Sequence, residues 1–400
     1  MRRHRSRCNA CRACASPPCT GAWGAQSERH PPCFQPPCTR RYSRYREVDD
    51  CCSDDPPAEP ALAEDGGLQP HKPRDPWFDN ARAILIALVI VGHLIEQMGT
   101  RSSDALYTWI YAFHMPAFVL ISGYLSKSFT ASARQSKALV ATLLVPYVVF
   151  RTIHEVERWL VTGGFSVKLF NPSFALWFLL ALFVWRLATP ILRVLRYPFI
   201  LAVILFVTVP LDSSLGTTFT LGRIFGFLPY FVLGLVLRPE YFEILRRTWA
   251  RWVGAGVLVL GAIPAWIYSP RLAHADLYLR GSYESAGHGW LDGALLRLLL
   301  LAIGITGTAA VLAVTSRAQT WCTVVGRNSL TVYLLQAAII FPLNLQSLPG
   351  GAWGAAGTVT AAIAGVVLAA FLGSPLVERA THWMVRPPTG WLLRRAPEPA

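Results

Sequence analysis

Charged residues are scarce in this chain of 400 residues. Only 15% of the sequence is Asp, Glu, Lys or Arg, whereas 53% is hydrophobic. Soluble proteins carry nearer to a quarter charged residues, so this composition excludes an ordinary soluble globular protein. The hydrophobic residues also fall into blocks of about 20, the length that spans the hydrocarbon core of a bilayer. The sequence therefore predicts an all-α, polytopic helical membrane protein.

Cysteine is almost absent from the hydrophobic part of the chain. Of nine cysteines, eight precede residue 77, and Cys322 alone lies among the hydrophobic segments. A body with one cysteine is not built on disulfides, and it contains no cluster with metal-ligand spacing. We therefore predict no metal site there.

Residues 1–76 lack both hydrophobic periodicity and the hydrophobic core of a signal peptide. The spacing Cys8-x2-Cys11-x2-Cys14-x4-Cys19 is similar to a metal or iron–sulfur ligand run. The Pro- and Arg-rich composition instead favours a disordered N-terminal tail. A third interpretation stays open, in which the segment is upstream DNA translated from a mis-set start and Val48 is the true first residue. An intact-mass measurement that finds residues 1–47 in the native protein would exclude it.

The hydrophobic body, residues 77–380, divides into about ten segments of membrane-spanning character. They run near 78–98, 107–125, 138–153, 174–191, 197–211, 221–237, 250–268, 291–314, 325–345 and 354–377. A basic tail, 381–400, follows.

The net charge of +14 comes largely from the loops. It could indicate nucleic-acid binding, but Arg and Lys gather in the loops after even-numbered segments, while loops 212–220 and 346–353 have none. Cytoplasmic loops of membrane proteins carry such an excess of Arg and Lys. We expect both termini in the cytoplasm, a location in the bacterial cytoplasmic membrane, and no nucleic-acid partner.

The first segment carries three ionisable residues, Arg82, His93 and Glu96. Ionisable groups are costly inside hydrocarbon, so in a spanning helix they indicate function. Arg82 and His93 are eleven residues apart, which puts them on one helix face roughly 16 Å apart along the axis. Glu96, three residues after His93, joins that face. An imidazole beside a carboxylate suits general-base removal of a proton from a hydroxyl.

Other polar residues divide between the inner surface and the outer half of the membrane. Arg82, Lys137 and Arg186 lie near the inner surface, where cations suit the phosphates of a nucleotide-bearing donor; Lys137 and Arg186 could instead simply extend to the interface. The residues toward the outer half are His114, Arg151, Arg223, Asp292 and Arg297. Arg223 could be an interface anchor, and Asp292 and Arg297 an internal pair of one helix.

Several motifs resemble the acyltransferase 3 family of integral-membrane O-acyltransferases, and in particular its fucose 4-O-acetyltransferase-like branch. The first is the basic residue, ten intervening positions and a histidine, here Arg82 and His93. The others follow in the same order as in that branch: 113–118 (FHMPAF), 121–125 (ISGYL), 144–147 (LVPY), 176–179 (LWFL), 227–231 (FLPYF) and 326–330 (GRNSL) with Tyr333. The resemblance covers roughly residues 76–380.

This resemblance implies transfer of an acyl group from cytoplasmic acetyl-CoA or another acyl-CoA to a hydroxyl of an extracytoplasmic sugar or glycan, with acyl-CoA as co-substrate and no bound cofactor. His93 is then the catalytic base, with Glu96 and His114 as partners, and Arg82 and Lys137 contact the donor. The expected substrate-binding residues are Arg151, Trp177, Arg223, Arg297 and Tyr333.

Two positions depart from the family pattern. Thr142 stands where a basic residue is expected before LVPY, leaving Lys137 or Arg134 to supply that charge, and Gln336 stands where a histidine often follows. Two other functions stay open. One is a transporter or flippase of a polar lipid or glycan, although the sequence shows no convincing internal repeat. The other is an acyltransferase acting on a small secondary metabolite.

Overall fold

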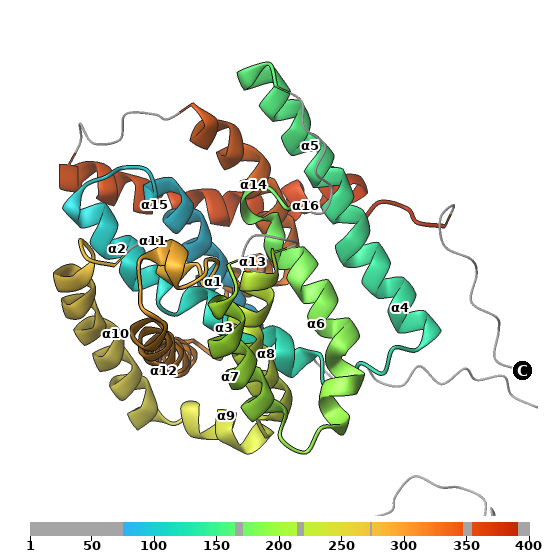
Figure 1. Ribbon diagram of the computed structural model, residues 1–400. Helices are drawn as coiled ribbons and strands as arrows, with labels where there is room; N and C mark the ends of the chain where they lie inside the picture. Colours follow the sequence, from blue (N-terminus) through green and yellow to red (C-terminus); the bar gives the residue numbers. More distant parts are fainter. Residues whose placement is uncertain (1–74, 165–170, 214–219, 273, 347–353, 391–400) are drawn as a thin grey trace, which may run out of the picture. The chain divides into compact units, whose positions relative to one another are not determined.

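The computed structural model describes residues 75–164, 171–213, 220–272, 274–346 and 354–390. The predictions for residues 1–74 and for the end of the basic tail, 391–400, lie outside these residues. In the described ranges the chain forms helices and no strand (Figure 1). Seven helical runs are long and apolar enough to cross a membrane, or up to nine if each of two bent helix pairs is one span. The prediction of an all-α polytopic membrane protein is confirmed.

Each of the ten predicted segments coincides with a helix or a helix pair. The seven long runs are α1 (Pro76–Ile95), α2 with α3 (Arg101–Tyr111, His114–Leu125), α4 through α5 (Ala133–Leu139, Val145–Thr162), a short 3-10 turn with α6 (Phe174–Leu176, Trp177–Val194), α10 (Thr248–Tyr268), α12 (Trp290–Val314) and α15 (Gly354–Leu372). The bent pairs are α8 with α9 (Leu221–Val236, Pro239–Leu245; 99°) and α13 with α14 (Trp321–Arg327, Ser329–Leu345; 73°). The shorter helices are α7 (Pro198–Thr208), α11 (His274–Leu277) and α16 (Pro375–Val385).

The predicted end of the third segment at residue 153 was nine residues too early. The helix continues to Thr162 although its last two turns are rich in charge. Glu155 accounts for this, because it pairs with Arg151 one turn before it and with Arg158 one turn after it. Such i,i+3 and i,i+4 pairs stabilise a helix that hydrophobicity alone would end sooner. In Figure 1, α4 and α5 form one long rod along the edge of the bundle.

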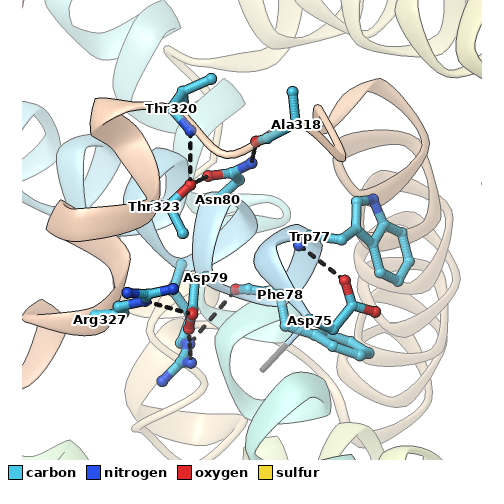
Figure 2. A network of polar contacts seen from close by, with 10 residues as sticks. Asp75, Trp77, Phe78, Asp79, Asn80, Ala318, Thr320, Thr323 and Arg327 are labelled. Atoms are coloured by element: carbon cyan, nitrogen blue, oxygen red, sulfur yellow. Dashed lines mark hydrogen bonds and ion pairs between the residues drawn. The ribbon is translucent and has the colours of Figure 1, made fainter. Parts of the chain in front are cut away.

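Helix α1 begins in a dense polar network (Figure 2). The Asn80 side-chain amide donates to the carbonyl oxygens of Ser316 and Ala318, 2.8 Å each, and its oxygen accepts from the Thr323 hydroxyl at 2.7 Å. Asp79, only 1% exposed, pairs with Arg82 and Arg327. Buried polar groups are costly unless paired, so this network holds the start of α1 in one position against the segment that leads into α13.

Helices α3 and α8 cross at backbone contact. A Cβ on Gly123 would lie 2.1 Å from the Phe231 carbonyl oxygen, and one on Gly234 would lie 2.1 Å from that of Leu120. Small residues allow this approach in membrane helices, where packing rather than hydrophobicity drives association. The contact brings the first turn of α8, with Arg223, toward the helices that carry the histidines.

Candidate active site

One face of α1 links two cavities. Arg82, Ile86, Val89, His93 and Glu96 follow at spacings of four, three, four and three residues, which is one stripe of an α-helix. His93 and Glu96 line a cavity of about 320 Å³, here called the His93 cavity, whereas Arg82 and Ile86 line one of about 230 Å³, the Arg82 cavity. Val89 lines both.

The His93 cavity collects six residues that the sequence predicted for the site. They are His93, Glu96, His114, Trp177, Arg223 and Tyr333. They come from α1, α3, α6, α8 and α14, so segments more than 200 residues apart meet at one cavity. Three tyrosine and arginine residues that the sequence did not single out also line it: Tyr111, Tyr278 and Arg280.

His93 is oriented from one side and open on the other. Its Nδ1 lies 3.5 Å from Glu96 Oε2 and 3.5 Å from the Tyr111 hydroxyl. The ring packs on Phe174 with centroids 4.4 Å apart. Within the described chain Nε2 makes no hydrogen bond, and 14% of the side chain is exposed. Catalytic hydrogen bonds are often long before substrate binds, so the arrangement fits a base held at Nδ1 with Nε2 available to a hydroxyl.

His114 has a more fixed environment. It is 2% exposed, and its Nδ1 lies 2.9 Å from the Ile110 carbonyl oxygen. A carbonyl only accepts, so Nδ1 carries the proton and Nε2 is an acceptor. The ring meets Tyr111 edge to face, with centroids 4.5 Å apart. His114 therefore supports the wall on which Tyr111 and His93 meet.

Tyr278 completes the carboxylate side of the site from the loop that follows α11. Its hydroxyl donates to Glu96 Oε1. Burial raises the pKa of Tyr278, and the adjacent Glu96 charge raises it further, so the hydroxyl stays protonated and donates. In the sequence, the aromatic and polar character of loop 269–290 is only a general signal for Tyr278.

The loop that carries Tyr278 is anchored to the helices at several points. Gly226 on α8 makes room for Leu279, whose carbonyl oxygen would lie 2.9 Å from a Cβ at that position, and Leu279 itself has a left-handed φ of 51°. The Arg297 guanidinium donates to the carbonyl oxygens of Gly281 and Phe206 at 3.1 and 3.2 Å. A non-glycine residue such as Leu279 keeps a left-handed backbone only when its surroundings impose it. Arg297, predicted to bind substrate, thus holds the loop.

Arg82 shares its cavity with Arg186 of α6 and with the serine and threonine side chains of Ser122, Thr142 and Ser329. Arg186 Nε donates to the Ser126 hydroxyl at 3.2 Å. The side chains of Val89, Met115, Phe178 and Tyr333 line both cavities and so form the wall between them. The Tyr333 hydroxyl donates to the Ala175 carbonyl oxygen, which ties α14 to the turn before α6.

Lys137 and Arg151 are not among the lining residues of either cavity. Lys137 lies in the last turn of α4, and Arg151 is buried in its pair with Glu155. Arg186, which the sequence could also assign to the membrane interface, lines the Arg82 cavity instead.

Tyr278→Phe removes one hydrogen bond from the Glu96 carboxylate and keeps the ring. Loss of a hydrogen bond to a charged group costs about 1.5–3 kcal/mol, so we expect turnover to fall roughly 10-fold or more with the protein still folded. Steady-state acyl transfer in membranes measures this. Tyr268→Phe, at an exposed tyrosine of α10, is the control, and equal activity of the two variants would contradict a role for the Tyr278 hydroxyl.

These features define a helical membrane protein in which one helix joins a cationic cavity to a cavity with a histidine–carboxylate pair. A family model described as an acyltransferase domain, Acyl_transf_3, matches residues 75–377. The chain belongs to the acyltransferase 3 family, and it is a multi-pass membrane acyltransferase.

Two curated relatives match over a shorter length. Nodulation protein NolL of Mesorhizobium japonicum is 41% identical over 91 residues, which are 20% of this chain and 24% of that protein. Nodulation protein NolL of Sinorhizobium fredii is 34% identical over 128 residues, 28% of this chain and 35% of that protein. The matched segments thus span about a quarter to a third of these relatives. No solved structure matches the chain significantly.

Proposed function

We propose that this protein moves an acetyl group from acetyl-CoA in the cytoplasm to a hydroxyl of a sugar or glycan on the other side of the membrane, with His93 as general base. The observation that carries the proposal is the stripe of α1, which has a cation at one cavity and a histidine–carboxylate pair at the next. A transfer reaction needs two adjacent sites, one that binds the donor and one that binds the acceptor.

The Arg82 cavity is the donor entrance. Arg82 and Arg186 provide guanidinium groups for the phosphates of CoA, to which charge-assisted hydrogen bonds are strong. The acyl-carrying arm then passes the wall of Val89, Met115 and Phe178 toward His93. Arg82 and His93 are eleven residues apart on α1, roughly 16 Å along the axis, a distance suited to a long, flexible arm.

The His93 cavity is the reaction site. His93 Nε2 takes the proton of the acceptor hydroxyl while the oxygen of that hydroxyl attacks the thioester carbonyl carbon. The carbon–sulfur bond then breaks, and the thiolate of CoA receives the proton from the imidazolium. Glu96, held by Tyr278, stabilises the charged imidazole in between. The excess of Arg and Lys in the loops on the Arg82 side supports a cytoplasmic position for that end of the protein in a bacterial plasma membrane.

The test supplies acetyl-CoA labelled in the acetyl group to inside-out membrane vesicles that contain the protein. Label on O-acetylated carbohydrate, absent with His93→Ala, is the expected result. Label on a small metabolite instead would support the alternative function, an acyltransferase that acts on a small secondary metabolite. If no acetyl-CoA is consumed and an unmodified polar lipid crosses the membrane, the result would support a transporter and contradict the proposal.

Arg82→Gln is expected to raise KM for acetyl-CoA roughly 10- to 100-fold, because one charge-assisted contact is worth about 1.5–3 kcal/mol. The maximal rate should change much less, since Arg82 lies away from the reacting atoms. Arg327→Gln is the matched control: Arg327 also pairs with Asp79 but does not line the cavity. An equal rise in KM in both variants would assign the effect to Asp79 rather than to donor binding.

A further inference from the structure

Arg223 is a buried cation at the His93 cavity with no acidic partner in the described part of the chain. It lies in the first turn of α8 and is only 9% exposed. Its guanidinium packs over Trp177, 4.9 Å from the ring centroid, and over Tyr278 at 5.1 Å. Among the described residues its Nε has no hydrogen-bond partner.

Two other buried arginines have their partners within the protein. Arg151 pairs with Glu155, and Arg297 donates to two backbone carbonyls. Burial of an unpaired charge is strongly unfavourable. Contacts with two aromatic rings offset part of this cost. The remaining cost indicates that Arg223 receives an anion that is not part of the protein.

Arg223 and the His93–Glu96 pair share Tyr278 as a neighbour. Tyr278 contacts Arg223 through its ring and Glu96 through its hydroxyl, and Glu96 contacts His93. Arg223 and the His93–Glu96 pair are thus connected through Tyr278, and all four residues line the same cavity. The carbon of the guanidinium lies 4.9 and 5.1 Å from the two ring centroids. Its N–H groups are the part that can donate to a ligand in the cavity.

We propose that Arg223 is a further catalytic residue, which donates to the carbonyl oxygen of the acyl thioester and stabilises the oxyanion of the tetrahedral intermediate. This inference rests on the proposed function. When the acceptor oxygen bonds to the carbonyl carbon, the carbonyl electron pair moves to its oxygen and His93 holds the acceptor proton. The electron pair returns as the carbon–sulfur bond breaks, and the thiolate takes the proton from His93. Guanidinium groups placed where such charge develops contribute to rate rather than to ground-state binding.

Arg280 is less suited to this role. It also lines the His93 cavity and lies 5.9 Å from the Tyr278 ring centroid, but it is exposed. Water screens an exposed charge, whereas a buried donor acts in a low dielectric, where it is worth more. The buried arginine, rather than the exposed one, is therefore the oxyanion donor.

The experiment measures two reactions of the purified full-length protein in lipid nanodiscs: acetyl transfer, and the slower hydrolysis of acetyl-CoA by water without acceptor. Arg223→Ala should lower kcat of both by the same factor, roughly 10²–10³-fold, because both pass through the oxyanion. KM for acetyl-CoA should change little. Added guanidinium chloride should restore part of both rates to Arg223→Ala, which also shows that the variant is folded. Arg271→Ala, at an exposed position of the same loop, should leave both rates unchanged, and guanidinium chloride should not raise the rates of this variant.

Three results would overturn the inference. A raised KM for acetyl-CoA with unchanged kcat would make Arg223 a donor-binding residue. Loss of transfer with normal hydrolysis would make it a residue for an anionic acceptor. Loss of both without guanidinium rescue, in protein of normal abundance and thermal stability, would exclude a donor at this place. A wild-type protein that neither transfers nor hydrolyses would contradict the proposed function itself.

Discussion

His93→Ala is expected to lower acyl transfer by roughly 10²–10⁴-fold, the usual contribution of a general base. His93 lines its cavity, and its Nδ1 lies 3.5 Å from both Glu96 Oε2 and the Tyr111 hydroxyl. Without the imidazole the acceptor hydroxyl keeps its proton and attacks the thioester poorly. Turnover with saturating donor and acceptor, per amount of protein in the membrane, is the measurement.

The control for His93→Ala is a histidine outside both cavities. His154 on α5 is fully buried, its Nδ1 lies 2.7 Å from the Ser173 hydroxyl oxygen, and it lines neither cavity. His154→Ala should leave turnover per folded molecule nearly unchanged, although it can lower stability. Activity of His93→Ala within a few-fold of wild type would remove His93 from the catalytic step, and an equal loss in both variants would indicate damage to the fold.

Gly326→Ala is expected to prevent stable folding. A Cβ at Gly326 on α13 would lie 1.7 Å from the Asp79 carbonyl oxygen on α1, and neither backbone can give way without separating the two helices. The polar network of Asn80 and Asp79 would separate with them (Figure 2). Overpacking usually costs about 1–3 kcal/mol and occasionally more, and a backbone clash of this size belongs to the upper end.

Gly256→Ala on α10 is the matched change with the opposite expected sign. A Cβ there meets nothing within 4 Å, and alanine in a helix interior is favoured over glycine by roughly 0.5–1 kcal/mol. The thermal unfolding temperature in detergent and the yield of protein from membranes should be lower for Gly326→Ala than for wild type. Both should be unchanged or higher for Gly256→Ala. Equal stability of the two variants would contradict the close contact of α1 with α13.

The sequence was most informative where function and helix periodicity fall on one segment. Arg82, His93 and Glu96 share a face because their spacing follows the helical repeat, and no other part of the chain is needed to see that. The span-length rule likewise placed ten hydrophobic segments on helices or bent pairs; within the described chain seven to nine of these are long enough to cross a membrane, and the segment near 197–211 forms a shorter helix. It missed the charged end of α5, since hydrophobicity does not register the Arg151–Glu155 pair that continues that helix.

Residues from separate segments were harder to assign. Arg151 and Arg297 have the charge that a substrate site needs, yet the first is paired with Glu155 and the second holds backbone carbonyls. Tyr278 lies in a polar loop like many others, and contacts such as that of Leu279 with Gly226 hold it near Glu96. Whether a charge is satisfied inside the protein depends on neighbours that are distant in sequence.

The sequence by itself determined the class of fold, the order of the membrane segments and the polar stripe of α1, because these depend on composition and on periods within one helix. The tertiary structure alone decided which residues join that stripe. It placed Arg186 in the cavity of Arg82, the Tyr278 hydroxyl on Glu96, and Arg223 at the cavity of His93. The physical reason is that a site between helices is made by crossings and loop contacts, where glycines such as Gly123 and Gly226 allow close approach.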